Sequence, residues 1–370
     1  MNKLEFDDLI NEYQNEICGE YYTIKTLLLV MSSKFVKNKK AISFHTLLNS
    51  ESGAGKDFIL QKVMGALPRS DFHSYTRISA RALDYLDPKE VYNSGCLTWD
   101  NKFLGLQDIE AEILNASTLK VFLSDGSQTA IVLDGKVVET KHKGSPIILM
   151  TSAYSNPNKE LMRRVNILNL DESDTQTRNI LRLQAKRFGV QDIDYEVIRG
   201  HFSSLKQYTV FIPYALKMAD LISANGTHMR TFFNKFLDFI KASAVFSQSE
   251  RDVKHGILQA NLLDYEVAKD IFINLSLTIK MNPLSRDKKE QLELLTAEFE
   301  GDWFSTKQAM AVFSITYKAT RLIIKYLQEN GFLAVERRAD EFSNRPVSYY
   351  KPKEPEQIKF PTTEELYNEC

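Results

Sequence analysis

The stretch NSESGAGKDFIL, residues 49–60, limits the possible folds of this chain more than any other feature of its sequence. It places Gly53 and Gly55 directly before Lys56, after an apolar run that predicts a strand and before a pattern that predicts a helix. Glycines allow backbone N–H groups to turn inward around phosphates, and the lysine neutralises phosphate charge. A flexible glycine turn is the alternative, but the strand before it and the helix after it favour a phosphate-binding loop.

The loop departs from the Walker A pattern at a position that bears on metal binding. Asp57 follows Lys56 where the pattern has Ser or Thr, whose hydroxyl usually ligates Mg²⁺. A carboxylate is also a hard oxygen ligand, so Asp57 can reach the metal directly or through water. We therefore expect ATP and Mg²⁺ as cofactors. The expected nucleotide-binding residues of the loop are Ser52, Gly53, Ala54, Gly55, Lys56, Asp57 and Phe58.

The hydrophobic pattern divides the chain into regions of different type. Buried strands are predicted within ISFHTLLN, CLTWDNKFLGLQ and SPIILMTSA, which alternate with helical patterns, so the fold class is α/β with a parallel sheet. The expected regions are a helical N-terminal segment at 1–40, an α/β core at 41–185, an all-helical region at 186–287, a winged-helix domain at 288–351 and a flexible tail at 352–370.

Polar residues at the ends of two predicted strands are candidate catalytic residues. The strand FLGLQ ends at Asp108, with Glu110 two residues later, and such carboxylates can hold Mg²⁺ and polarise an attacking water. Helix N-caps are the alternative role for these acids. The strand SPIILMTSA ends in Thr151 and Ser152, which either sense the nucleotide or form a turn.

Two arginines, Arg163 and Arg164, precede a further predicted strand. An arginine at this position can reach a phosphate held by a neighbouring subunit, and a surface ion pair is the alternative. A site completed by a neighbour's arginine requires at least two subunits, so we expect a homo-oligomer.

The segment SQTAIVLDGKVVETKHKG predicts a β-hairpin that carries several cations. Asp134 and Gly135 suit the positive dihedral angles of a two-residue turn between the strands AIVL and KVVE. The family resemblance described below implies that lysines of this hairpin contact a DNA backbone, and an ordinary solvated hairpin is the alternative. The basic residues of the segment are Lys136, Lys141, His142 and Lys143.

A second basic cluster lies on the helix and strands at the end of the predicted winged helix. Its members are Lys318, Arg321, Lys325, Arg337, Arg338 and Arg345. They suit contacts with DNA phosphates, and protein docking is the alternative.

Composition restricts the possible classes of function but does not identify a binding partner. The chain has 370 residues and a net charge of -1, so a contact with DNA must come from local basic patches. Three cysteines without metal-ligand spacing indicate free thiols in a reducing compartment, and no apolar run reaches the roughly 20 residues that span a bilayer. We expect a cytoplasmic protein without membrane contact.

Taken together, these segments resemble the AAA+ helicases of phages, plasmids and genomic islands, which are related to the minichromosome-maintenance helicases. The resemblance covers roughly residues 20–275. It rests on SGAGKD, RISARALDYL, LGLQDIEAE, FLSDGSQ, PIILMTS, MRRVNILNLDESDTQT and RTFFNKFLDFIKASAVFSQSER, in this order. It implies an AAA+ core with a helical lid.

The resemblance also implies roles for single residues. Lys56 binds phosphate, Asp108 stands at the position of the catalytic glutamate, Thr151 is the first sensor, Arg164 is the finger that acts on a neighbouring subunit, and Arg230 is the second sensor. The chain departs from the family at Asp57 and at Asp108, which is shorter than glutamate, so Glu110 can share its role.

The function expected from these features is that of a ring-forming, hexameric DNA helicase for replication of a mobile element. The chain shows no zinc-ligand cluster, so we expect a separate primase as partner rather than a fused one. Two alternatives are a DNA-binding initiator or loader that uses ATP as an assembly switch, and a transposition-associated regulator. Asp57 and Asp108 keep the first alternative open, whereas the hairpin and the winged helix favour the helicase over the second.

Overall fold

The structure is a computed structural model, and it divides into two compact units that are considered separately. Unit 1 comprises Met1–Leu275 and Phe360–Cys370, and unit 2 comprises Ser276–Lys359. The residues that the structure describes are 5–92, 98–124, 128–133, 136–141, 144–153, 159–186, 192–222, 229–280, 286–329, 331–339, 346–353 and 358–367. Among the helices of these residues, none has both the length and the apolar character needed to cross a membrane.

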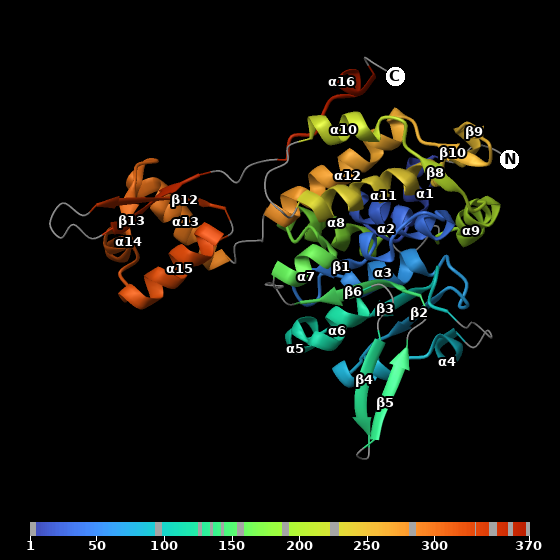
Figure 1. Cartoon of the computed structure of the whole chain (residues 1–370), viewed down its shortest axis with the longest axis horizontal. Coiled ribbons are helices and arrows are strands. Elements are labelled where there is room, and N and C mark those ends of the chain that lie inside the picture. Colours follow the sequence, from blue (N-terminus) through green and yellow to red (C-terminus); the bar gives the residue numbers. More distant parts are fainter. Residues whose placement is uncertain are drawn as a thin grey trace. The chain divides into compact units, whose positions relative to one another are not determined.

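A five-stranded parallel sheet forms the centre of unit 1 (Figure 1). Its strands are β1 (Thr46–Asn49), β2 (Phe72–Tyr75), β3 (Phe103–Leu106), β6 (Ile147–Ser152) and β7 (Asn166–Asn169). Their order across the sheet is β2-β3-β6-β1-β7. β1, β3 and β6 are buried along their whole length, as strands covered on both faces are. The predicted parallel α/β core is confirmed, and β2, a partly polar edge strand, is one that the apolar pattern missed.

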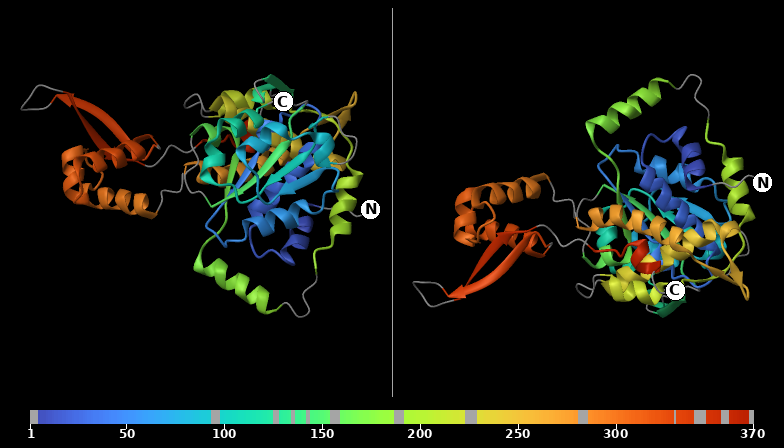
Figure 2. Two further views of the ribbon diagram at one scale, coloured as in Figure 1. Left: turned by 90° about the horizontal axis from the view of Figure 1, so that it is seen from below. Right: turned by 90° about the horizontal axis from the view of Figure 1, so that it is seen from above.

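Helices cover the sheet and fill the rest of unit 1. They are α1 (Phe6–Gln14), α2 (Tyr21–Ser32), α3 (Lys56–Met64), α4 (Pro88–Tyr92), α5 (Ala111–Asn115), α6 (Ser117–Phe122), α7 (Lys159–Arg164), α8 (Asp174–Ala185), α9 (Tyr195–Ser204), α10 (Ala215–Leu221), α11 (Met229–Phe246), α12 (Leu262–Lys280) and α16 (Thr363–Tyr367). Short 3₁₀ turns lie at Ser33–Phe35, Ala41–Ser43, Ala80–Tyr85 and Gln248–Glu250. In both views of Figure 2, α8 lies at the edge of the unit, and only Gln176 on this helix is buried.

The N-terminal segment is part of this unit rather than a separate region. The ring of Phe6 stacks on that of Phe246 with 3.7 Å between centroids, and the Tyr13 hydroxyl donates to the carbonyl of Val63 at 2.9 Å. α2 is buried over nearly its whole length, so it must lie inside a larger core.

The periodicity of region 186–287 predicted helices alone, but this prediction is wrong in part. It contains a small sheet in the order β8-β10-β9, formed by β8 (Thr209–Phe211), β9 (Val253–Lys254) and β10 (Ile257–Gln259). These strands have two or three residues, too few to interrupt a helical pattern over a longer window.

The expected flexible tail is also corrected, because residues 360–367 pack on unit 1. The ring of Phe360 lies 5.1 Å from that of Phe236, and the Tyr265 hydroxyl donates to the carbonyl of Pro361 at 2.5 Å. Leu366 on α16 is fully buried. These apolar side chains, set among charged residues, hold this end of the chain on the core.

The predicted hairpin is confirmed by two antiparallel strands, β4 (Gln128–Leu133) and β5 (Lys136–Lys141), with Leu133 paired to Lys136. It projects from the body of unit 1 (Figure 1). The turn at 134–135, His142 and Lys143 lie outside the described residues, and so do the side chains of Lys136 and Lys141.

Unit 2 has the predicted order of three helices and two strands, with one short strand added. The helices are α13 (Arg286–Phe299), α14 (Thr306–Phe313) and α15 (Tyr317–Glu329). The strands β11 (Phe304–Ser305), β12 (Leu333–Ala339) and β13 (Pro346–Pro352) form an antiparallel sheet in the order β11-β13-β12. Its core includes Leu295, Phe304, Ala309, Ile324 and Leu327, all buried.

Candidate nucleotide-binding site

The glycine-rich loop leaves the carboxyl end of β1 and enters α3 at Lys56. Gly53 has a φ of 89° and Gly55 a φ of 91°, a left-handed conformation that L side chains rarely adopt. A Cβ atom at either glycine would meet no atom within 4 Å, so the space beside the loop is open. The two glycines are therefore required for the path of the backbone, and the loop leaves room for a ligand at the helix N-terminus.

Two polar side chains of the loop are buried without a partner. Lys56 is only 4% exposed, and within the described part of the chain its ammonium group has no hydrogen bond or ion pair. The Ser50 hydroxyl, at the position of the first glycine of the Walker A pattern, is also buried and unpartnered among these residues. Buried polar groups normally have partners, so both groups fit an anionic ligand such as a triphosphate.

Thr151 connects the loop with the strand that ends at Asp108. Its hydroxyl donates to Oδ1 of Asp57, and it accepts a hydrogen bond from the backbone N–H of Asp108 at 2.8 Å. This contact is possible because β6 lies between β1 and β3, so that the three strand ends meet at one edge of the sheet. The structure thus brings together three residues that the sequence predicted separately.

Asp108 has an unusual backbone conformation. Its φ of 45° is left-handed, which few non-glycine residues adopt, although Asp tolerates it better than most. Glu110 immediately precedes α5 and its side chain makes no capping hydrogen bond. Both carboxylates are exposed and line a cleft of about 490 Å³, which Arg77 also lines. A cation facing these acids was not predicted, because Arg77 lies some 30 residues earlier in the chain.

Gln107 is the residue before Asp108, and its role at the site was not predicted. Gln61 on α3 donates to its Oε1 at 3.0 Å, and its Nε2 donates to the Ser74 hydroxyl on β2 at 2.7 Å. The side-chain amide therefore ties the end of β3 to the helix after the loop and to the neighbouring strand.

Glu172 contacts the start of the loop, since its Oε1 accepts a hydrogen bond from the backbone N–H of Glu51 at 2.6 Å. It belongs to the segment DES, which was singled out above only because it resembles a segment of the AAA+ helicases. A contact between residues 121 positions apart leaves no signal in local patterns.

The acidic residues at this edge suit a magnesium ion bound together with a nucleotide. Among the described residues, no three acidic, histidine or cysteine side chains gather into a preformed metal site. Mg²⁺ is usually held by one or two carboxylates, with phosphates and waters as its other ligands. Two carboxylates are available here: that of Asp57, which accepts from the Thr151 hydroxyl, and that of Asp108, whose backbone N–H donates to the same hydroxyl.

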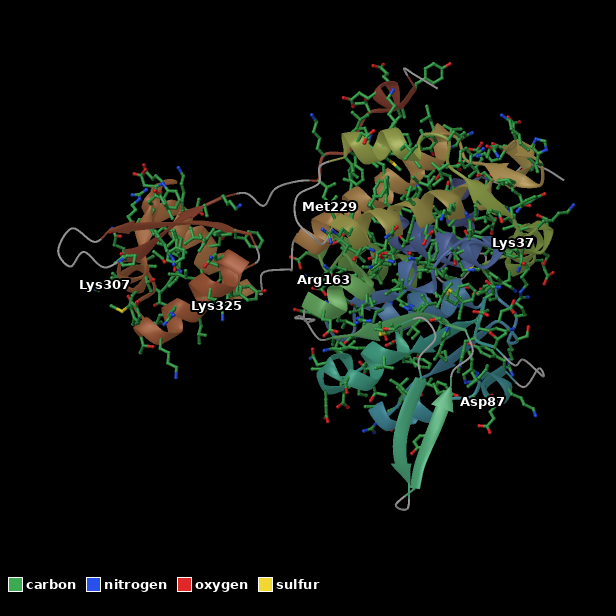
Figure 3. The ribbon with its side chains drawn as sticks, viewed as in Figure 1. Lys37, Asp87, Arg163, Met229, Lys307 and Lys325 are labelled. Carbon is green, nitrogen blue, oxygen red and sulfur yellow. The ribbon has the colours of Figure 1, made fainter. Side chains whose placement is uncertain are left out.

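The two arginines before β7 differ in their surroundings. Arg164 donates to the Ser124 hydroxyl at 2.5 Å and pairs with Glu160 at 3.3 Å. Arg163 is exposed and has no partner within the described part of the chain (Figure 3). Arg230, in the first turn of α11, is exposed, and among the described residues no contact joins its side chain to the loop.

The cations of unit 2 lie on two elements. Lys318, Arg321 and Lys325 are exposed and spaced three and four residues apart, so they share one face of α15. Lys325 is labelled in Figure 3. On β12, Arg337 is exposed, whereas Arg338 pairs with Glu336 at 2.9 Å and lies 5.0 Å from the ring of Trp303. Arg345 lies outside the described residues.

Comparison with known proteins agrees with the geometry of the loop. A family model described as the MTBMA_p00010 P-loop domain matches residues 3–208, which is more than half of the chain and includes Lys56, Asp57, Asp108 and Thr151. No curated protein matches the sequence. The chain therefore belongs to the MTBMA_p00010 P-loop domain family and has the α/β core of a P-loop NTPase.

Proposed function

We propose that this protein is an AAA+ ATPase that assembles into a ring and moves along DNA as a helicase for replication of a mobile element. The observation that carries the ATPase part is the contact of Thr151 with both Asp57 and Asp108. A polar residue on the strand between the loop and the catalytic carboxylate is placed where it can respond to the state of the nucleotide.

Each residue has a distinct part in this proposal. Lys56 and the N-terminus of α3 bind the phosphates, because both present positive charge to the open side of the loop. Asp57 and Asp108 would hold Mg²⁺, which when bound supplies positive charge to the phosphate oxygens. Asp108 and Glu110 orient and deprotonate the attacking water, and their exposure in the cleft leaves them accessible to it. Thr151 fixes the positions of Asp57 and Asp108 relative to each other.

For the arginine that completes a neighbour's site, the surroundings support Arg163 over Arg164. Arg164 already has partners in its own subunit, Ser124 and Glu160, whereas the guanidinium of Arg163 is exposed. An arginine acting on developing charge across an interface typically contributes about 10³-fold or more to the rate.

Two features support DNA as the substrate of the motor. The β4–β5 hairpin precedes β6, the strand with the proposed sensor Thr151, and it projects from unit 1. A segment that contacts a DNA strand inside a protein ring must project in this way. In unit 2, the exposed cations of α15 suit phosphate contacts if this unit acts as a winged helix. Phosphate contacts of this kind hold DNA without reading its bases.

An ATPase assay with paired variants tests the site. Lys56→Ala should abolish nucleotide binding and turnover, whereas Arg163→Ala should bind nucleotide normally and lose turnover. Mixing the two inactive variants should restore part of the activity, because some interfaces then join an intact loop to an intact arginine. Arg164→Ala serves as the comparison and should lose less turnover. Normal turnover by Lys56→Ala would refute the site, and rescue by Arg164→Ala in place of Arg163→Ala would reverse the assignment of the arginine.

A further inference from the structure

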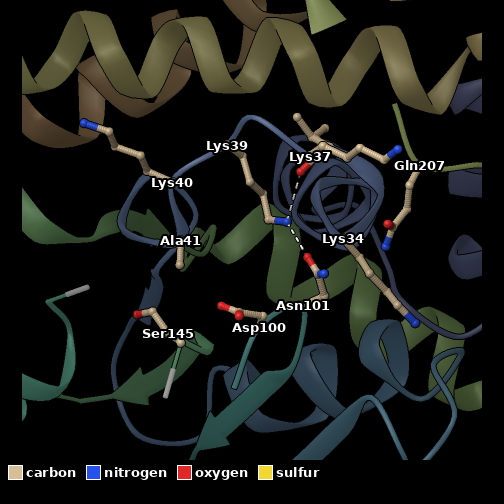
Figure 4. Close-up of a pocket in the computed structure, with 11 residues that line it drawn as sticks. Lys34, Lys37, Lys39, Lys40, Ala41, Asp100, Asn101, Ser145 and Gln207 are labelled. Atoms are coloured by element: carbon tan, nitrogen blue, oxygen red, sulfur yellow. Dashed lines mark hydrogen bonds between the residues drawn. The ribbon is translucent and has the colours of Figure 1, made fainter. Parts of the chain in front are cut away.

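A second pocket of unit 1 lies on the opposite edge of the sheet from the loop. Figure 4 shows the residues that line it. It has a volume of about 440 Å³. Its walls come from the segments that lead into β1, β3 and β6, namely 34–41, 100–101 and 144–145, and from Gln207. Because these strands are parallel, the segments before them gather at the amino edge, whereas the loop stands at the carboxyl edge.

Positive charge exceeds negative charge in the walls of this pocket. Lys34, Lys37, Lys39 and Lys40 line it together with a single carboxylate, that of Asp100. Lys34 forms an ion pair with Asp71, which lies outside the pocket lining. The ammonium groups of Lys37 and Lys40 have no partner within the described residues. The Asp100 carboxylate accepts a hydrogen bond from the Thr98 hydroxyl at 2.9 Å, which takes up part of its capacity.

Two groups in the pocket are shielded from solvent, Lys39 in part and Ser145 almost fully, and both are still able to bind an anion. Lys39 donates to Oδ1 of Asn101 at 2.6 Å and to the carbonyl of Val36 at 3.2 Å, so both of its partners are neutral. Burial lowers the pKa of Lys39 to about 8, since the charged form is poorly solvated there. The Ser145 side chain is 8% exposed, and its hydroxyl has no partner in the described part of the chain.

The chain that returns from the hairpin forms one wall. Gly144 has a φ of 76°, and a Cβ atom there would come within 2.6 Å of the Thr98 hydroxyl oxygen, so only glycine fits. This close approach places Ser145 in the wall of the pocket a few residues after β5. The pocket and the hairpin therefore share one continuous segment.

We propose that this pocket binds a backbone phosphate of a single-stranded nucleic acid, with Lys37, Lys39 and Ser145 as direct contacts. Ammonium and hydroxyl donors match phosphate oxygens, which accept most protein contacts to nucleic acids. Figure 4 shows Lys39 reaching over Asn101 and Lys37 beside Gln207, whereas Lys40 points away from both. The choice of nucleic acid over a free anion rests on the proposed function, because the wall continues from the hairpin proposed to grip DNA.

Binding of a fluorescein-labelled oligothymidylate of about 20 nucleotides tests the site by anisotropy between about 50 and about 200 mM salt. The double variant Lys37→Gln, Lys39→Gln should bind about tenfold or more weakly. Its plot of log Kd against log salt should be flatter by about 1.4, which is about 0.7 for each lost contact with a single strand. Lys206→Gln, an exposed lysine outside the pocket, should behave like the wild type. A fluorescent ATP analogue should bind all three proteins equally, which also shows that they are folded.

Amine acetylation of the wild-type protein, followed by mass spectrometry, provides a second readout. The oligothymidylate should protect Lys37 and Lys39, whereas inorganic phosphate at the same phosphate concentration should not. Protection by inorganic phosphate alone would make the pocket a free-anion site and overturn the nucleic-acid assignment. Normal salt dependence in the double variant, without protection, would refute the pocket while leaving the proposed function intact. Absence of oligothymidylate binding by the wild type would refute both.

Discussion

At the scale of single residues, Thr151 is the point where the parts of the site meet. It is fully buried, yet its hydroxyl is used twice, once towards Asp57 and once towards the N–H of Asp108. Asp57 is therefore held by β6, the strand that pairs with β1 in the sheet, before any metal is bound. The substitution of Asp for Ser or Thr at residue 57 is compatible with this site because the carboxylate has a fixed partner.

Replacing Thr151 by Val should lower ATP hydrolysis about 10- to 100-fold with little change in nucleotide affinity. Valine keeps the volume but removes the hydroxyl, and a hydrogen bond to a charged group contributes about 1.5–3 kcal/mol. Thr151→Ser, which retains the hydroxyl, is the matched control and should keep most of the activity. Steady-state turnover and equilibrium binding of a fluorescent nucleotide give the two values. Equal turnover by both variants would mean that the hydroxyl has no part in the reaction.

His45 should make the stability of the protein depend on pH. Burial lowers the pKa of His45 to about 3, from an ordinary value near 6.5, and its Nδ1 accepts the N–H of Ile148 at 3.0 Å. Between these two values the unfolded chain binds a proton that the folded chain does not, so the free energy of unfolding decreases as pH falls below about 6.5. The slope from one such group is at most about 1.4 kcal/mol per pH unit.

Urea unfolding from pH 7 to pH 4.5 measures this dependence. His45→Gln should be less stable at pH 7 but should show a flatter pH dependence, whereas His255→Gln, at an exposed position, should follow the wild type. His201, whose pKa burial lowers to about 4, contributes in the same direction and remains in both variants. An unchanged slope in His45→Gln would contradict a neutral, buried His45.

At the scale of structural elements, a buried ion pair joins the segment after α11 to the start of α12. Arg251 donates from Nε to Oδ2 of Asp264 at 2.8 Å and from one terminal nitrogen to Oδ1 at 2.9 Å. Asp264 is fully buried and also accepts from the Ser243 hydroxyl at 2.9 Å and from the N–H of Asn261 at 2.9 Å. The segment SQSER was singled out above only for its resemblance to the AAA+ helicases. Through Arg251, its last residue, it also has a structural role.

Arg251→Ala should lower the free energy of unfolding by about 3–5 kcal/mol, because it leaves a buried carboxylate without its counter-charge. Asp252→Ala changes the neighbouring exposed residue and should cost well under 1 kcal/mol. Arg251→Lys keeps the charge but loses the two-point contact, so its stability should lie between the two. Thermal and urea unfolding provide the comparison, and a loss below about 1 kcal/mol in Arg251→Ala would show that the pair adds little.

The sequence predicted those helices and strands whose own residues carry a strong local pattern. The parallel strands β1, β3 and β6 are continuous apolar runs, and the hairpin has a turn pair between alternating strands, so each carries its own signal. Edge strand β2 and the short strands β8 to β10 were missed because their residues are partly polar or too few. Thr151, Asp57 and Asp108 were each predicted as site residues, but their contacts were not. The contacts of Gln107 and Glu172 were also missed, because they join positions far apart in the chain.

At the scale of the whole molecule, the chain leaves unit 1, forms unit 2 and returns to unit 1 at Phe360. The returning segment buries Leu366 and places Phe360 against Phe232 and Phe236. The segments before and after unit 2 therefore both belong to the core of unit 1, and deleting unit 2 by truncation also removes part of that core.

Two deletions separate these effects. Truncation after residue 280 should destabilise unit 1 by a few kcal/mol, because burying a Phe or Leu side chain contributes about 1.5–3 kcal/mol. Replacement of 286–353 by a flexible linker keeps the returning segment and should preserve stability and ATP turnover while weakening DNA binding. Thermal unfolding, ATPase and anisotropy assays check the three expectations. Equal stability of the two proteins would mean that residues 360–367 are not part of the core in solution.

The measurement that tests the central claim most directly is ATP-dependent unwinding of a forked DNA by the wild-type protein, beside Lys56→Ala. If the protein is a ring-forming motor, the wild type should hydrolyse ATP faster with DNA and separate the strands, and Lys56→Ala should do neither. ATP binding without turnover, and a fork left intact at all protein concentrations, would contradict a motor and favour a protein that uses ATP as an assembly switch.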